Sequence, residues 1–540
     1  MKERHVPIRY DKKGNPYWDS ELSKPDNSIA VAMMVPDRII PVIFVPGIMG
    51  SNLRGNTQKT ESVKWRVDGL TSLGPWMGRG AKRRKETLQP QLMEVDNEGL
   101  IPPGTEQDNE ELKRRGWGEV GKFSYGDFLV WLENTLNDYD HPHGGVRDSL
   151  IGSVLQAEKG EAALTKDEVS LSYRYRFPVY ACGYNWLDSN ANSSTRLQQR
   201  IEKIIQRYRK ARNKCEKVII VTHSMGGLVA RHCSQVRGME DKIFGIVHGV
   251  MPTLGAAATY RRMKAGNENP GGGIAGWFGG YAASKALGED AAEMTAVLST
   301  APGPLQLLPT PEYGNGWLQI KNGAQEDFLP KHNDPYTEIY TVRGEWWGLC
   351  EDHLVNPLND ARQAKVRQAQ MDVDWDNFEE TINRSVKIFH QDITRKYHPN
   401  SHAFYSADPR KCAYGNVIWR GGSKAGESLL SGNRPSYPMA GRALNPSEVG
   451  SSRTIAAPLG GTGWKSAVQQ RYTLSDPEEA GDGTVPLRSG VAPRQHVVSM
   501  LSVNVGHEPA YKESEPARLY TVRAIVKIMQ SVNQTSLSYE

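Results

Sequence analysis

Three residues of the chain have the side-chain types that nucleophilic acyl transfer requires. They lie in three glycine-containing segments: Thr222-His223-Ser224-Met225-Gly226-Gly227, Gly481-Asp482-Gly483-Thr484-Val485-Pro486 and Val503-Asn504-Val505-Gly506-His507. A serine hydroxyl becomes an effective nucleophile when a histidine accepts its proton, and a carboxylate fixes the tautomer of that histidine and stabilises its charge. We therefore predict Ser224 as the nucleophile, His507 as the base and Asp482 as the acid that orients the base.

Each of these assignments has an alternative. Small-x-Ser-x-Gly patterns are common, Asp-Gly is a frequent turn pair, and most of the 13 histidines cannot be catalytic. The other candidates for the base are His223, His402 and His496. Alternation along a strand points His223 to the opposite side of the sheet from Ser224. His496 precedes the last predicted strand instead of following it, so His507 is preferred.

The residues around Ser224 predict the element that positions it. Residues 217–221 are mostly β-branched, and a helix-forming segment follows the small-residue turn directly. A strand, a tight turn and a helix with serine at the apex form a nucleophile elbow. The turn requires a small residue at Gly226, and Thr222 replaces the usual first glycine. Because Met225 begins the helix, its backbone N–H is predicted to stabilise an oxyanion.

A second strand and loop are predicted to supply the other oxyanion donor. Residues 38–45 form a continuous apolar run, and the glycine-rich segment Pro46-Gly47-Ile48-Met49-Gly50-Ser51 follows it. A loop after an early strand contributes the second donor in this kind of site. The backbone N–H of Ile48 is the candidate, paired with that of Met225. A turn that needs glycine for positive φ explains the same residues, and the two interpretations are compatible.

The alternation of elements predicts an α/β-hydrolase fold with a mostly parallel central sheet and large cap or lid insertions. Further strands are expected at 176–186, 243–250 and 337–342, and helices at 125–133, 195–212, 360–395 and 513–532. Residues 1–37 are expected to be an irregular arm, and 38–540 the core, interrupted at about 54–170, 255–335 and 350–465. The glycine-rich residues 265–280 fit either a mobile lid or a loop with a few core anchors.

Composition excludes several other classes of function. The net charge is only +5, and the one basic run, Lys82-Arg83-Arg84-Lys85, is expected in a solvated loop, so no nucleic-acid partner is predicted. Five scattered cysteines predict no disulfide framework. The first residues lack a signal peptide and no membrane span is visible, which predicts a cytoplasmic protein in the producing cell. No metal motif occurs, so no cofactor is expected to be required, and calcium remains an option without a supporting motif.

The motifs at residues 45–51, 222–227, 481–486 and 506–507 together resemble the lipases related to lecithin–cholesterol acyltransferase. Arg115-Gly116-Trp117-Gly118-Glu119-Val120, Ser124-Tyr125-Gly126 and His402-Ala403-Phe404-Tyr405 resemble a narrower group, the class-three phospholipase effectors of bacterial type VI secretion systems. This resemblance implies an antibacterial toxin that attacks acyl esters of membrane phospholipids after delivery to the periplasm of a rival cell. It also implies a VgrG or PAAR carrier and a cognate immunity protein. An intracellular esterase or acyltransferase, or a non-catalytic binding protein on a hydrolase scaffold, remain the alternatives.

Overall fold

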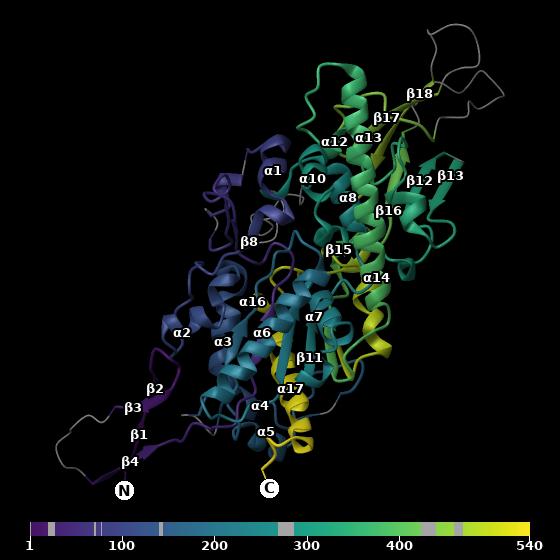
Figure 1. Cartoon of the computed structure of the whole chain (residues 1–540). Helices are drawn as coiled ribbons and strands as arrows, with labels where there is room; N and C mark the ends of the chain where they lie inside the picture. Colours follow the sequence, from purple (N-terminus) through teal and green to yellow (C-terminus); the bar gives the residue numbers. More distant parts are fainter. Residues whose placement is uncertain are drawn as a thin grey trace.

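The computed structural model in Figure 1 describes residues 2–19, 27–69, 72–76, 78–139, 144–161, 163–267, 286–323, 325–422, 439–457 and 468–539. The glycine-rich residues 265–280, which fit either a lid or a loop with a few core anchors, lie outside these residues from position 268 onward. None of the described helices is long and apolar enough to cross a membrane.

The centre of the molecule is a six-stranded sheet with the strand order β20-β14-β11-β10-β5-β9. All neighbouring strands in it are parallel. The strands are β5 (Val42–Val45), β9 (Val179–Ala181), β10 (Val218–His223), β11 (Ile243–Gly249), β14 (Ser401–Tyr405) and β20 (Ser499–Ser502). Their continuous apolar character follows from burial on both faces, and the predicted mostly parallel sheet is confirmed.

Helices cover both faces of this sheet and create a core on each side. Ile43 and Val45 of β5 join a core that includes residues of α6 (Asn190–Lys210) and α7 (Gly226–Gln235). Val42 and Phe44 face the other core, with α3 (Asp127–Leu136) and α17 (Glu515–Met529). The predicted helices at 195–212 and 513–532 are therefore confirmed within a few residues.

The remaining described α-helices are short, apart from α13 on the upper part of the molecule (Figure 1). They are α1 (Ala81–Thr87), α2 (Asn109–Arg114), α4 (Val146–Ser149), α5 (Lys166–Ser172), α8 (Ala257–Ala265), α10 (Ala291–Leu298), α11 (Pro302–Leu305), α12 (Asp352–Val355), α13 (Ala364–Glu380), α14 (Lys387–Ile393), α15 (Leu487–Gly490) and α16 (Ala510–Glu513). α13 and α14 confirm the helical prediction for residues 360–395.

Residues 350–465 are expected to be one insertion outside the central sheet. In the structure this segment contains β14, which is a strand of that sheet. The chain thus returns to the core in the middle of that segment. The glycine- and serine-rich composition of residues 410–463 predicts a loop, but residues 417–421 and 452–457 form strands of a second, five-stranded sheet, β13-β12-β16-β18-β17. Its strands are β12 (Leu318–Asn322), β13 (Gln325–Leu329), β16 (Val417–Gly421), β17 (Ser452–Ala457) and β18 (Val468–Leu474).

Two further sequence predictions are wrong. The arm is not irregular: β1 (Lys2–Val6) pairs with β4 (Ser28–Ala32), and β2 (Ile8–Tyr10) pairs with β3 (Pro16–Trp18). The strand expected at 337–342 is a helical turn, Tyr336–Tyr340. Its buried residues Tyr336, Ile339 and Tyr340 have helical spacing, so burial on one face overrides the β propensity of the segment.

The other short strands pair locally around the ends of the central sheet. β6 (Leu53–Gly55) lies between β7 (Lys64–Trp65) and β8 (Met93–Val95), and β15 (Asp408–Ala413) pairs with β19 (Glu479–Gly481). β19 leads directly into the turn that carries Asp482.

Candidate active site

Ser224 occupies the predicted elbow between β10 and α7. Its φ of +51° is a conformation that residues other than glycine rarely adopt. The Ser224 backbone N–H donates to the carbonyl of Gly249 at 2.9 Å, which ties the turn to the neighbouring strand. A Cβ at Gly226 would lie 2.5 Å from the carbonyl oxygens of Val45 and Pro46, so only glycine fits there.

The structure brings the three predicted side chains together in one hydrogen-bonded series. His507 Nε2 lies 2.8 Å from Ser224 Oγ, and His507 Nδ1 lies 2.7 Å from Asp482 Oδ2. A carboxylate only accepts, so Nδ1 carries the proton and the bare Nε2 accepts the Ser224 hydroxyl. The other Asp482 oxygen accepts the N–H groups of Thr484 and Val485 at 2.9 and 2.7 Å, which fixes the carboxylate in its turn.

The loop after β5 lies beside the serine, as the sheet register requires. Val45 of β5 pairs with Thr222 of β10, so the two strands end at the same edge of the sheet. A Cβ at Gly47 would lie 3.0 Å from Ser224 Cβ and 2.8 Å from His223 Nδ1. Within the described part of the chain, the backbone N–H groups of Ile48 and Met225 donate to no other group. Neither N–H group is therefore committed to an internal acceptor, as the predicted oxyanion donors require.

His223, the alternative candidate for the base, lies directly behind the predicted base His507. Its Nε2 is 2.8 Å from the backbone carbonyl of His507, and its Nδ1 is 2.9 Å from the Tyr125 hydroxyl. That hydroxyl also accepts the N–H of Gly47 at 3.1 Å. A carbonyl only accepts, so Nε2 carries the His223 proton and Tyr125 must donate to Nδ1. One continuous chain of donors thus joins the loop after β5 to the backbone of His507.

Burial keeps this chain of hydrogen bonds uncharged. Desolvation lowers the pKa of His223 to about 3, and the neighbouring His507 acts in the same direction. Burial also raises the pKa of Tyr125. The sequence signals for this pair were the position of His223 next to Ser224 and the Ser124-Tyr125-Gly126 segment. Neither reveals that the two residues touch, because they are 98 positions apart.

The other two candidates for the base, His402 and His496, lie outside the site. His402 is buried on β14, with its Nδ1 2.7 Å from Ser499 Oγ, and His496 stacks on Tyr397 with ring centroids 4.9 Å apart. In the described ranges, no cluster of three or more His, Cys, Asp or Glu side chains is arranged to hold a metal ion.

Comparison with known proteins places the fold. The family model of the PGAP1-like alpha/beta domain matches residues 190–263, the segment that contains the elbow. The crystal structure of the Tle4–Tli4 complex matches with a TM-score of 0.73 and 28% identity, over 91% of this chain and 98% of that chain. The search of curated proteins found no match.

These matches confirm the predicted α/β-hydrolase fold and the resemblance to type VI secretion phospholipase effectors. The chain therefore has an α/β-hydrolase fold and is similar over nearly its whole length to Tle4, which supports a hydrolase of the lipase type.

Proposed function

We propose that the chain is a serine-dependent lipase or phospholipase that hydrolyses acyl esters of membrane phospholipids. The observation that carries this proposal is the series Ser224 Oγ, His507 Nε2, His507 Nδ1 and Asp482 Oδ2, with distances of 2.8 and 2.7 Å at its two hydrogen bonds. These are the contacts that general-base activation of a serine needs.

In the proposed reaction, Ser224 Oγ attacks the acyl carbonyl carbon while its proton moves to His507 Nε2. The backbone N–H groups of Ile48 and Met225 stabilise the resulting oxyanion. When the tetrahedral adduct collapses, the carbon–oxygen bond to the alcohol breaks and His507 protonates the leaving alkoxide. A water molecule, deprotonated by His507, then attacks the acyl-serine, and the fatty acid leaves as Ser224 recovers its proton. Asp482 holds the imidazole and stabilises its positive charge in both halves.

The similarity to Tle4, solved with Tli4, supports a biological setting for this chemistry. The protein is proposed to be an antibacterial toxin that a type VI secretion system delivers to the periplasm of target bacteria. A VgrG or PAAR carrier is proposed to transport it, and a cognate immunity protein is proposed to protect the producing cell.

The first test is fatty-acid release from defined phospholipid vesicles by the purified protein and by its Ser224→Ala variant. We expect release by the native protein and a loss of at least a thousandfold in the variant, because the nucleophile is removed while the oxyanion donors remain. A control variant, Ser536→Ala, changes an exposed hydroxyl far along the chain and should retain full activity.

The outcomes distinguish the alternatives. Equal release by the native protein and Ser224→Ala would exclude serine catalysis. Transfer of the acyl group to an added alcohol in preference to water would identify an acyltransferase. Activity restricted to short soluble esters would indicate an intracellular esterase. No activity on any ester, from a folded protein, would indicate a binding protein on a hydrolase scaffold.

A further inference from the structure

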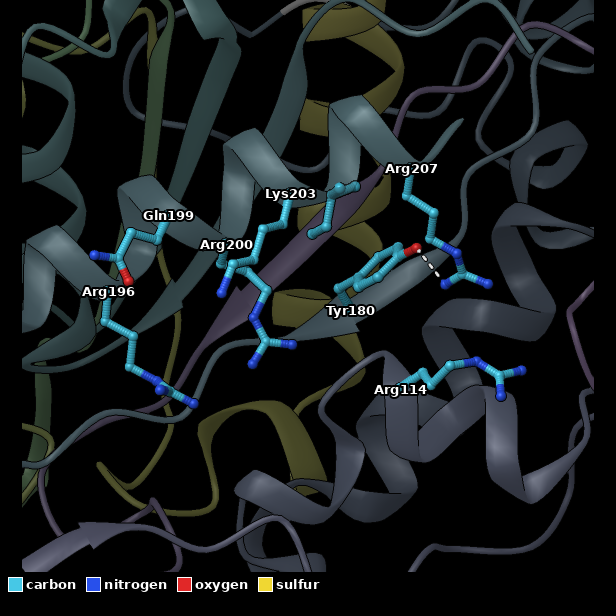
Figure 2. Close-up of a pocket in the computed structure, with 8 residues that line it drawn as sticks. Arg114, Tyr180, Arg196, Gln199, Arg200, Lys203 and Arg207 are labelled. Atoms are coloured by element: carbon cyan, nitrogen blue, oxygen red, sulfur yellow. Dashed lines mark hydrogen bonds between the residues drawn. The ribbon is translucent and has the colours of Figure 1, made fainter. Parts of the chain in front are cut away.

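A strongly basic cavity lies beside β9, the edge strand of the central sheet. It has a volume of about 320 Å³ and is lined by Arg114, Tyr180, Arg196, Gln199, Arg200, Lys203, Ile204 and Arg207. Figure 2 shows the cationic side chains extending from α6, with Arg114 facing them from α2. None of the residues of the candidate active site lines this cavity.

The spacing along α6 places these side chains on one face of the helix. Arg196 and Arg200 are four residues apart, as are Gln199 and Lys203, and Lys203 and Arg207. Like charges at this spacing destabilise a helix. The opposite face already supplies the packing through the buried residues Leu197, Ile201, Ile205 and Tyr208. The basic stripe is thus not required to hold α6 on the sheet.

Nearby carboxylates neutralise only part of the charge. Glu119 pairs with Arg196 at 3.1 Å and also with Arg200. Glu111 pairs with Arg114 at 3.0 Å and with Arg207 at 2.6 Å. Four arginines therefore share two carboxylates and Lys203 adds a fifth positive charge, which leaves an excess of three positive charges around the cavity.

Glu111 also pairs with a third guanidinium, that of Arg115, but this leaves the excess of three charges unchanged. The fully buried Arg115 lies 2.8 Å from Glu111 and 3.0 Å from Glu133, so the carboxylate of Glu133 offsets its charge. The guanidinium groups of Arg114, Arg200 and Arg207 are consequently held in place by shared carboxylates but are not neutralised by them. A rigid, preorganised set of donors loses little conformational entropy when it binds an anion.

Two polar side chains in the cavity have no partner in the protein. Within the part of the chain that the structure describes, neither Lys203 nor Gln199 forms a side-chain hydrogen bond or an ion pair. Both are exposed at the mouth of the cavity. An ammonium and an amide are therefore available to a ligand without breaking any internal contact.

We propose that this cavity binds a phosphate group, either free phosphate or the phosphate of an anionic phospholipid headgroup. Guanidinium forks match phosphate oxygens in a bidentate manner, and Lys203 adds a point charge. A tetrahedral phosphate accepts hydrogen bonds from several sides, which suits donors that converge from α2 and α6. This proposal does not depend on catalysis at Ser224.

The test uses the double variant Gln199→Glu/Lys203→Glu, which cancels the excess of three charges without removing an internal contact. Gln206→Glu/Lys210→Glu is the matched control, because it makes the same substitutions at the same spacing on exposed positions of α6 outside the cavity. Both are made in full-length Ser224→Ala protein so that lipid stays intact. Binding of inorganic phosphate is measured by calorimetry, and binding to vesicles of phosphatidylcholine, with and without phosphatidylglycerol, by co-sedimentation.

We expect the cavity variant to bind at least tenfold more weakly than its parent, and the control to bind like the parent. Selective loss of binding to phosphatidylglycerol vesicles assigns the site to a lipid headgroup, and loss of phosphate binding alone assigns it to soluble phosphate. Lys203→Gln, which adds no negative charge, should show a smaller loss in the same assay. Binding of neither ligand by the parent, or equal binding by the cavity variant and the control, would overturn the proposal.

Discussion

The hydrogen bonds behind the predicted base link the loop after β5, the helical turn Lys122–Gly126, the end of β10 and the loop that carries His507. Tyr125 accepts from Gly47 in the loop that carries Ile48, and donates to His223, which in turn donates to the backbone of His507. Because the members are buried and uncharged, these hydrogen bonds should not change with pH. We infer that this chain positions the oxyanion donors and the base relative to Ser224.

Replacing Tyr125 with phenylalanine tests this positioning role. The change leaves the Gly47 N–H and His223 Nδ1 without partners, which should lower the free energy of unfolding by about 1–3 kcal/mol. It should also lower kcat by about ten- to a hundredfold with little change in KM, because small displacements of catalytic groups are costly. Steady-state kinetics on a soluble ester measure both constants.

Tyr336→Phe is the matched control for that experiment. The Tyr336 hydroxyl lies 2.8 Å from His390 Nδ1, and His390 Nε2 lies 2.9 Å from the carbonyl of Gln306, so the same tyrosine–histidine–carbonyl arrangement occurs outside the site. It should lose similar stability and keep its kcat. Equal kcat in the two variants would show that Tyr125 has only a structural role.

Among the elements, α1 shows how a basic run becomes part of the interior. The segment was expected in a solvated loop, but Arg84 and Lys85 are buried. Arg84 lies 3.2 Å from Glu293 of α10, and Lys85 Nζ lies 3.3 Å from Ser299 Oγ just after that helix. These contacts hold α1 against α10, and α10 belongs to the described part of the predicted 255–335 insertion.

The buried ammonium of Lys85 makes the stability of this contact depend on pH. Burial lowers its pKa to about 8, whereas the unfolded chain has an ordinary lysine pKa near 10.4. Between these values the unfolded state holds more protons, so the contribution of Lys85 to the free energy of unfolding rises with pH by up to about 3 kcal/mol. Below pH 8 its unfavourable contribution is complete.

Lys85→Met should therefore be more stable than the native protein at pH 7, and this advantage should shrink toward pH 10.5. Chemical denaturation at several pH values measures the difference. Lys82→Met, at an exposed position of α1, should change stability little at any of them. An advantage for Lys85→Met that stays constant with pH would contradict a titrating lysine.

For the molecule as a whole, two cores flank one sheet, and both enclose polar groups that burial keeps neutral. Desolvation lowers the pKa of His223, His248 and His402 to about 3 and that of His232 and His390 to about 4. An unfolded chain protonates all five below about pH 6.5. The unfolded state then binds more protons than the folded state, so stability falls as pH falls.

At pH 5 each of these histidines should have lost about 2 kcal/mol of stability relative to neutral pH, and the five together about 10 kcal/mol, which is comparable with the stability of a whole domain. We expect the thermal midpoint to drop steeply between pH 7 and pH 5. The slope of the unfolding free energy against pH reports how many more protons the unfolded state binds than the folded state. In His390→Gln this number should decrease by one. A midpoint that does not change across this range would refute the prediction.

Local sequence was sufficient for the nucleophile elbow and for the long amphipathic helices. Strand, small-residue turn and helix around Ser224 follow one another directly along the chain, and the apolar spacing of α6 is a property of the helix alone. The chain order of Ser224, Asp482 and His507 also follows from motifs a few residues long. Each of these features depends on neighbours in sequence, so periodicity and turn chemistry predict them.

Tertiary structure alone decided the features that depend on distant partners. β14 is short and contains polar residues, and it becomes a core strand only between β11 and β20. His223 finds its partners 98 and 284 positions away, and the basic cavity forms only because Arg114 of α2 meets the charged face of α6. Pairing of short strands, and burial of a polar group against a specific donor or acceptor, are set by contacts between remote segments, which leave no periodic trace in the sequence.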